Sequence, residues 1–264
     1  PFPAIFLLIP AILVGINKVN PVFICVLLTI LNFFSMKKIL DSLAVSKKLT
    51  LWILLAFFFG TGYWYVLITS LLVYGFAHIS CVTMLLLAIR EAFGKRRGWI
   101  IGFCLGAAFL SRQMSVFTGL FLLYFLVDHE IQKNKINYTN ILLFAGSALL
   151  FLGIYFWYNY ERFGNILQTG YEYIAYIGHM KARVESYGVF NIQYLPFNFY
   201  TMFIKGHNIV FEGSTLMNIK SIDLFGTSII TASPYLVFVY KCKWRKDYIY
   251  TIGAAISIIL VGLL

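Results

Sequence analysis

The sequence predicts an all-α fold, a polytopic bundle of transmembrane helices. Of its 264 residues, 61% are hydrophobic and only 12% are charged, and the mean hydropathy is +0.83. Soluble domains carry about 25% charged residues and roughly half apolar ones. Apolar runs near the length of a membrane span recur along the whole chain, and runs such as ILLFAGSALLFLGIYF lack the strict alternation of a membrane β-strand.

The apolar runs define the expected elements. A helix needs about 20 apolar residues to cross the hydrocarbon core. The runs 99–111 and 115–127 are short, and we interpret them as a tight hairpin that turns at LSRQMS. The run 1–16 is also short and contains prolines, which favours a juxtamembrane or re-entrant helix on the outer face over the alternative of a full span. We expect residues 1–264 to form a single transmembrane domain. The full set of candidate runs is 1–16, 20–36, 51–67, 71–89, 99–111, 115–127, 140–158, 226–240 and 249–264.

The positive charge is distributed as in membrane proteins. The formal net charge is +11, but the basic residues form short clusters between apolar runs, which is typical of cytoplasmic loops and argues against a nucleic-acid partner. With these clusters in the cytoplasm, residues 159–225 form one long extracytoplasmic loop. The clusters start at Lys37, Arg90, Asp128 and Lys241, and together they hold most of the 21 Lys and Arg.

Two ionisable residues accompany the apolar runs. Arg112 ends the run IIGFCLGAAFL, where Gly102 and Gly106 allow another helix to approach closely. A guanidinium there suits a phosphate group, because its planar donors match phosphate oxygens; the alternative is an arginine that reaches the lipid headgroups. His78 could donate a hydrogen bond to a ligand or carry a proton, or it could bond to a neighbouring helix.

The stretch YNYERFGNILQTGYEY, residues 158–173, follows one of the most apolar runs. Tyrosines are enriched at membrane interfaces for reasons unrelated to function. The glycines permit sharp turns beside Arg162, Tyr171 and Glu172. The stretch therefore predicts either a turn that presents polar groups to a ligand at the interface or a decorated interfacial loop.

Several motifs are absent from the sequence. It contains no Gly-rich phosphate loop, no HExxH, no G-x-S-x-G and no cluster with the spacing of metal ligands. Every Asp and Glu falls between the apolar runs, whereas transporters commonly carry acids within their spans. We therefore identify no cofactor or metal site, and the metal dependence of a longer protein stays open.

The motifs resemble a known family. YNYERFGNILQTGY resembles a segment that follows a late transmembrane helix in bacterial GT-C-type glycosyltransferases, the superfamily of the dolichyl-phosphate-mannose protein mannosyltransferases and ArnT-like enzymes; Ile166 stands where proline is common. CLGAAFLSRQ resembles their G-L-A-x-L-T-R-P stretch, with Ser111 for Thr and Gln113 for Pro. PFPAIFLLIPAIL, AHISCVTMLLLAIREAFGKRRGW and YGVFNIQYLPFNFYTMF are similar to other family segments in the same order.

The resemblance implies a membrane glycosyltransferase that moves a sugar from a polyprenyl-phosphate carrier to an extracytoplasmic glycan, lipid or protein acceptor. In such enzymes a catalytic Asp or Glu lies in the first outer loop, which would precede Pro1, so we expect a fragment without that residue. Arg112 would contact the lipid phosphate with His78 nearby. Tyr171 and Glu172 would line the rim, and Arg162 would tie the turn.

The resemblance also implies a place in the cell, the bacterial cytoplasmic membrane with the active face outside. Two alternatives stay open. A transporter or flippase for a lipid-linked saccharide would need a polar midplane cavity with broken helices, and a membrane protein could have no functional site in this region.

Overall fold

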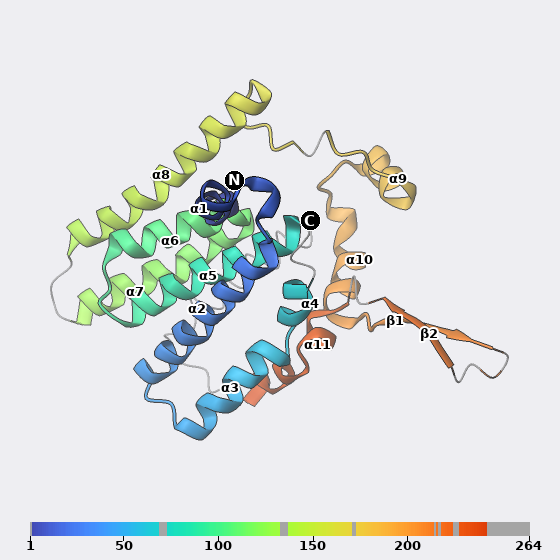
Figure 1. The fold of residues 1–264 in the computed structure, drawn as a ribbon, viewed down its shortest axis with the longest axis horizontal. Helices are drawn as coiled ribbons and strands as arrows, with labels where there is room; N and C mark the ends of the chain where they lie inside the picture. The colour runs from blue at the N-terminus through green and yellow to red at the C-terminus, as the bar shows by residue number, and fades with distance from the viewer. Residues whose placement is uncertain are drawn as a thin grey trace.

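Helices dominate the fold. The computed structural model describes residues 2–68, 73–132, 137–170, 173–213, 215, 218–223 and 227–241. In this part of the chain three helices are long and apolar enough to cross a membrane: α2 (Pro21–Ser42), α5 (Val73–Phe93) and α8 (Tyr138–Phe163). They are about 30 to 40 Å long, compared with about 30 Å for a hydrocarbon core. The predictions of long helices at 20–36, 71–89 and 140–158 are confirmed (Figure 1).

The ends of the long helices follow from their sequences. The Asn20 side chain accepts a hydrogen bond from the Val22 amide, 2.9 Å away, and Pro21 begins α2. Asn137 caps α8 in the same way through the Asn140 amide. At its other end α8 stops at Gly164, whose φ of 70° is the left-handed conformation that glycine adopts without strain.

The predicted hairpin is present. Helix α6 (Gly98–Ser111) is followed by a 3-10 segment, η3 (Gln113–Phe117), and by α7 (Thr118–Gln132). The helix stops because Arg112 adopts an extended conformation, with φ −147° and ψ 112°. The chain therefore reverses within LSRQMS, as the sequence predicts.

Close packing of α6 against α8 depends on glycines. A Cβ on Gly102 would lie 2.1 Å from the Phe144 carbonyl oxygen, and a Cβ on Gly106 would lie 2.6 Å from the Phe151 ring. Neither distance is compatible with a side chain, so this contact requires the small residues. The close approach predicted for these two glycines is confirmed.

The loop between α5 and α6 is fastened to the start of α8 by Asn140, a contact that the sequence does not predict. The Asn140 side chain accepts a hydrogen bond from the Gly98 amide at 2.7 Å and donates one to the Arg96 carbonyl at 2.9 Å. These two bonds fix the loop end of α6, while the glycines fix its middle.

The buried core has two parts that share α5. One lies among α5, α6, α7 and α8, with Ile101, Leu122 and Leu126 almost fully buried. The other lies among α2, α3 (Lys47–Phe59), α4 (Tyr63–Ile68) and α5, with Cys25 and Ile79 at its centre. Because α5 contributes to both, it holds the two halves together.

One predicted span is wrong, because 51–67 is not a single helix. Helix α3 ends at Phe59 and α4 begins at Tyr63. The Thr61 hydroxyl donates to the Phe57 carbonyl at 2.7 Å and accepts from the Tyr63 amide at 3.1 Å, so it caps both ends of the break. Glycines on either side of Thr61 add to the break, because glycine disfavours a helix interior.

The predicted run 226–240 is also broken. It forms α11 (Ile229–Ala232) and a 3-10 segment, η7 (Pro234–Lys241). Pro234 explains the break, since the residue before a proline avoids the helical region and Ser233 has a φ of −142°. The run 249–264 lies outside the described residues. The run 1–16 gives α1 (Pro3–Val14) and η1 (Ile16–Lys18), with a helix of only 12 residues.

The region predicted as the loop 159–225 is largely structured. Helix α8 continues into it as far as Phe163. It then contains α9 (Gly178–Tyr187), η5 (Ile192–Tyr194), α10 (Leu195–Phe199), a π-helical turn η6 (Tyr200–Ile204) and the strands β1 (Asn208–Glu212) and β2 (Asn218–Asp223). The antiparallel pair projects away from the helices (Figure 1). A strictly all-α fold is therefore wrong in this one element.

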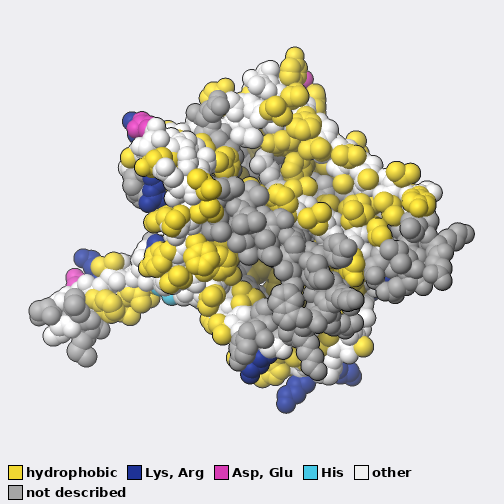
Figure 2. Space-filling model, turned by 180° about the vertical axis from the view of Figure 1, so that it is seen from behind, with side chains coloured by type: hydrophobic (Ala, Val, Ile, Leu, Met, Phe, Trp, Pro, Cys, Tyr) yellow, Lys and Arg dark blue, Asp and Glu magenta, His cyan; other side chains and the backbone are white. Residues whose placement is uncertain are grey.

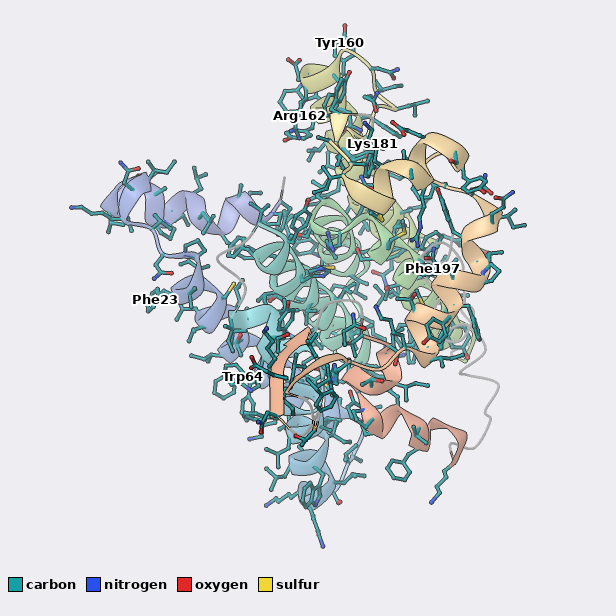
Figure 3. The ribbon with its side chains drawn as sticks, turned by 90° about the vertical axis from the view of Figure 1, so that its right-hand side faces the viewer. Phe23, Trp64, Tyr160, Arg162, Lys181 and Phe197 are labelled. Carbon is teal, nitrogen blue, oxygen red and sulfur yellow. The ribbon has the colours of Figure 1, made fainter. Side chains whose placement is uncertain are left out.

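Large hydrophobic side chains cover much of the outside of the helices. Figure 2 shows them spread over the described surface of one face. Phe23 on α2 and Trp64 on α4 extend outward from the ribbon (Figure 3), and Phe23 is 62% exposed. Contiguous apolar surface of this extent is rare on soluble monomers, and it is the surface that a lipid environment would cover.

Candidate functional site

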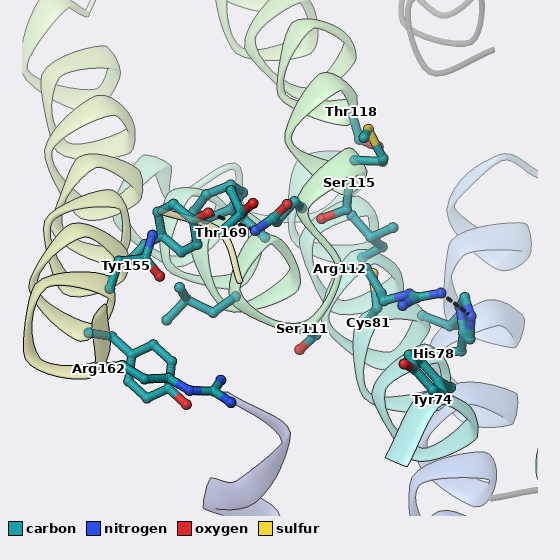
Figure 4. A pocket seen from close by; sticks show the side chains of 18 of the residues that line it. Tyr74, His78, Cys81, Ser111, Arg112, Ser115, Thr118, Tyr155, Arg162 and Thr169 are labelled. Carbon is teal, nitrogen blue, oxygen red and sulfur yellow. Dashed lines mark hydrogen bonds between the residues drawn. The ribbon is translucent and has the colours of Figure 1, made fainter. Parts of the chain in front are cut away.

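A cavity of about 970 Å³ lies at one end of α5, α6 and α8. It is lined by the first turns of α5, the last residues of α6, the turn into η3, the start of α7, the last turns of α8, the turn after α8 and Met202 from η6. Figure 4 shows the site from close by. Three residues predicted as site residues line it: His78, Arg112 and Arg162. The structure thus brings together residues from α5, from the turn after α6 and from α8.

Arg112 lies at the turn where α6 ends. Its amide donates to the Ala108 carbonyl at 2.8 Å, and its carbonyl accepts from the Ser115 amide at 3.0 Å. Both backbone polar groups of Arg112 are therefore hydrogen-bonded, so the backbone is fixed and only the side chain can change its conformation. The guanidinium reaches across to α5 (Figure 4).

His78 on α5 receives the Arg112 side chain. The guanidinium Nη2 is within hydrogen-bonding distance of the His78 Nε2 atom. Because a guanidinium can only donate, Nε2 must be the acceptor, and the imidazole is then neutral with its proton on Nδ1. His78 therefore holds Arg112, and both reach the cavity.

The opposite wall joins the hairpin turn to α8. Gln113 Nε2 donates to the Tyr155 hydroxyl at 2.8 Å. The Tyr155 ring also contacts Phe109 edge to face, with centroids 5.2 Å apart. Since Arg112 is extended, the side chains of residues 112 and 113 diverge, one toward α5 and the other toward α8.

Arg162 reaches the cavity from the last turn of α8. Its Cζ atom lies 5.0 Å from the centroid of the Phe163 ring, in the range of a cation–π contact. Figure 4 shows its guanidinium directed toward the space between α8 and the turn at Arg112. Arg162 thus lies beside the turn after α8 and lines the cavity, and its role toward a ligand stays a prediction.

The turn after α8 folds back onto the helix. The Asn159 side chain donates to the Ile166 carbonyl at 3.2 Å. The Phe163 and Tyr173 rings are stacked, with centroids 5.4 Å apart and planes 10° apart. Gly170 has a φ of 86°, and a Cβ there would lie 2.8 Å from the Phe163 ring. These contacts, rather than Arg162 alone, close the turn.

Two further predicted site residues, Tyr171 and Glu172, lie outside the described residues. Their neighbour Thr169 lines the cavity, and Tyr173 stacks on Phe163. Thr169 therefore borders the cavity before the gap, and after the gap Tyr173 packs on Phe163, which is itself a lining residue.

The charged side chains among the described residues that line the cavity are all basic. Arg112 and Arg162 contribute two guanidinium groups, and none of the described residues that line the cavity is Asp or Glu. The remaining lining is neutral and consists of hydroxyl, amide and aromatic groups around Ser111, Ser115 and Tyr158. A positive charge that no described lining residue compensates, at a concave and partly apolar site, favours an anionic ligand.

Sequence reasoning missed Gln113, Tyr155 and Asn159. Gln113 stands at the position of a proline in the family pattern, and this departure from the pattern was a usable signal. Tyr155 and Asn159 belong to α8. Tyrosine is enriched at membrane interfaces for reasons unrelated to function, so Tyr155 gave no specific signal. Tyr155 bonds to Gln113, which is 42 residues away in the chain, so this contact forms only in the folded protein. Asn159 bonds to Ile166, only 7 residues away, so this contact is local.

Comparison of the chain with protein-family models, with curated proteins and with solved structures gives no match. The family resemblance therefore stays a prediction that rests on the sequence motifs.

Proposed function

We propose that this chain is the headgroup-binding part of a membrane glycosyltransferase that moves a sugar from a polyprenyl-phosphate carrier to an extracytoplasmic glycan, lipid or protein acceptor. The observation that carries the proposal is the presence of Arg112 and Arg162 in one cavity with no described acidic residue in its lining. Two of the helices at whose ends the cavity lies, α5 and α8, are long enough to cross a membrane. A phosphate linked to a membrane-embedded chain carries its charge at the level of the lipid headgroups, where the ends of membrane-spanning helices lie.

The two guanidiniums fit the chemistry of a phosphate leaving group. When a sugar departs from its carrier, negative charge grows on the phosphate oxygens, and preorganised positive groups lower the barrier. Arginine suits this role because its planar donors match two oxygens at once. The contact with His78 holds Arg112 in place before the ligand arrives, which reduces the cost of ordering it on binding.

We propose that the cavity faces the outside of the bacterial cytoplasmic membrane. Helix α5 has His78 near its first residues and Arg90 near its last. Residues Lys95, Arg96 and Arg97 follow it directly, at the end remote from the cavity. Basic residues favour the cytoplasmic side, so the cavity end would be extracytoplasmic.

Binding of undecaprenyl phosphate to the purified chain in lipid nanodiscs tests the proposal. We expect Arg112→Ala and Arg162→Ala each to weaken binding at least tenfold, since one charge-assisted hydrogen bond is worth about 1.5–3 kcal/mol. Arg183→Ala is the matched control because it removes a guanidinium from α9, where Arg183 stacks on Phe197. Equal affinity in all four proteins would contradict the proposal.

A transporter of lipid-linked saccharide is the second candidate, favoured by the broken helix pair α3 and α4. Broken helices line the substrate sites of many transporters. Here the break at Gly60, Thr61 and Gly62 does not contribute to the lining of the cavity described above. Movement of a labelled lipid-linked sugar across proteoliposomes, without chemical transfer, would favour the transporter.

A further inference from the structure

We infer that the cavity wall formed by Gln113 and Tyr155 binds the hydroxyl groups of an uncharged saccharide. The inference rests on the proposed function, because it assigns the sugar that the lipid phosphate would carry. It concerns a different wall from the one that holds Arg112 and His78, so the two assignments can fail separately.

Hydrogen-bond accounting at this wall leaves at least one donor and one acceptor for a ligand. Gln113 Nε2 donates to the Tyr155 hydroxyl oxygen at 2.8 Å, so the Tyr155 O–H can still donate and the Gln113 Oε1 atom can still accept. If the amide is turned over, the phenol donates to Oε1 and the amide N–H is the spare donor. Either arrangement presents a neighbouring donor and acceptor, which is the pattern that a sugar hydroxyl needs.

The position of the pair relative to Arg112 suits a sugar phosphate. Gln113 is the next residue after Arg112, so their Cα atoms are about 3.8 Å apart. The extended conformation at Arg112, with φ −147°, directs the two side chains to opposite walls. An anion held by Arg112 would therefore lie at one wall of the cavity, and a group attached to it could extend across the cavity toward the wall that carries Gln113.

The rest of this wall is aromatic and neutral. Phe109 contacts the Tyr155 ring, and Tyr158 also lines the cavity. Aromatic side chains offer flat apolar surface beside a polar tip, and a pyranose has matching apolar and hydroxylated parts. A cationic amino sugar would find no carboxylate partner among the described lining residues, so we assign the site to uncharged sugars.

A site built to bind a hydroxyl group discriminates strongly, because its polar groups lose their partners when the hydroxyl is missing. The experiment therefore compares ligands that differ only in the sugar. The probes are farnesyl phosphate and the farnesyl phosphate esters of glucose, galactose, mannose and arabinose, with binding measured to the whole chain in nanodiscs. The variants are Gln113→Leu, Tyr155→Phe and the double variant.

We expect at least one sugar ester to bind the wild-type chain more tightly than farnesyl phosphate does. Each single variant should lose about tenfold in affinity for that ester, as expected for one or two neutral hydrogen bonds, and should bind farnesyl phosphate as the wild type does. Gln193→Leu and Tyr138→Phe are matched controls, since Gln193 and Tyr138 are exposed and lie outside the cavity lining.

The outcomes separate the two proposals. Equal loss for farnesyl phosphate and its sugar esters would mean that the pair only braces α8 against the hairpin turn, and it would overturn this inference alone. The inference is also overturned if no ester binds better than farnesyl phosphate. Failure of the wild-type chain to bind any of the five probes would contradict the proposed function as well. Thermal unfolding of each variant shows whether a loss comes from misfolding.

Discussion

The guanidinium of Arg112 donates a hydrogen bond to Nε2 of His78 and so links the turn after α6 to the first turns of α5. The two residues are 34 positions apart in the chain. This hydrogen bond restricts the conformations of the Arg112 side chain. We interpret His78 as the residue that positions Arg112 rather than as a ligand contact of its own.

Substitution of His78 tests this positioning role. We expect His78→Ala to weaken binding of undecaprenyl phosphate by about tenfold, because Arg112 would have to be ordered on binding and would lose one hydrogen bond. His78→Gln retains an acceptor at similar reach and should stay within about threefold of the wild type, in line with a modest geometric penalty. If alanine and glutamine behave alike, the acceptor at this position has no role.

Enlarging Gly102 should separate α6 from α8. A Cβ at this position would lie 2.1 Å from the backbone oxygen of Phe144, so we expect Gly102→Ala to lower the free energy of unfolding by about 1–3 kcal/mol. Gly146→Ala on α8 is the control, because a Cβ there has nothing within 4 Å; it should be neutral or stabilising by up to about 1 kcal/mol. Unfolding in detergent measures both, and an unchanged Gly102→Ala variant would contradict the close contact.

Removing the Asn140 side chain should loosen the loop between α5 and α6. The variant Asn140→Ala loses two hydrogen bonds, to Gly98 and Arg96, and we expect a cost of about 1–3 kcal/mol in unfolding free energy. Asn208→Ala on the exposed strand β1 is the matched control and should change stability by less than about 0.5 kcal/mol. Equal stability of the two variants would show that the Asn140 bonds contribute nothing.

The turn after α8 should depend on Gly170. Its φ of 86° is a conformation that residues with a side chain rarely adopt, and a Cβ at this position would lie 2.8 Å from the Phe163 ring. We expect Gly170→Ala to move the turn and to weaken binding of undecaprenyl phosphate several-fold, with faster proteolysis between residues 163 and 173. Gly164→Asn is the comparison, since Gly164 has a φ of 70° with open space around it and asparagine tolerates that conformation. Equal binding and cleavage in the two variants would contradict the account of the turn.

Hydropathy and small-residue spacing predicted much of the fold. Apolar runs located α2, α5 and α8, and the polar residues of LSRQMS located the turn at Arg112. The four-residue spacing of Gly102 and Gly106 indicated a close helix contact, which proved to be with α8. In each case the signal lies within one segment of the chain.

Features that depend on capping or on distant partners were not predictable in this way. Thr61 ends one helix and starts the next through two local hydrogen bonds, and a hydropathy window averages over this break. The β1–β2 pair is short and has a register shift between Val210 and Phe211. The alternation of apolar and polar residues that predicts a strand is therefore weak in this segment. The Gln113–Tyr155 pair spans 42 residues and exists only once α6 and α8 are together.

The central claim is that the cavity beside Arg112 and Arg162 opens to the outer leaflet and holds a lipid phosphate. Cysteine labelling at Thr169→Cys tests it most directly, in a background where Cys81 and Cys242 are replaced by serine. A membrane-impermeant maleimide should modify this cysteine from outside intact spheroplasts, and added undecaprenyl phosphate should slow the modification. Labelling only from the cytoplasmic side, or labelling from outside at a rate that the lipid leaves unchanged, would contradict the claim.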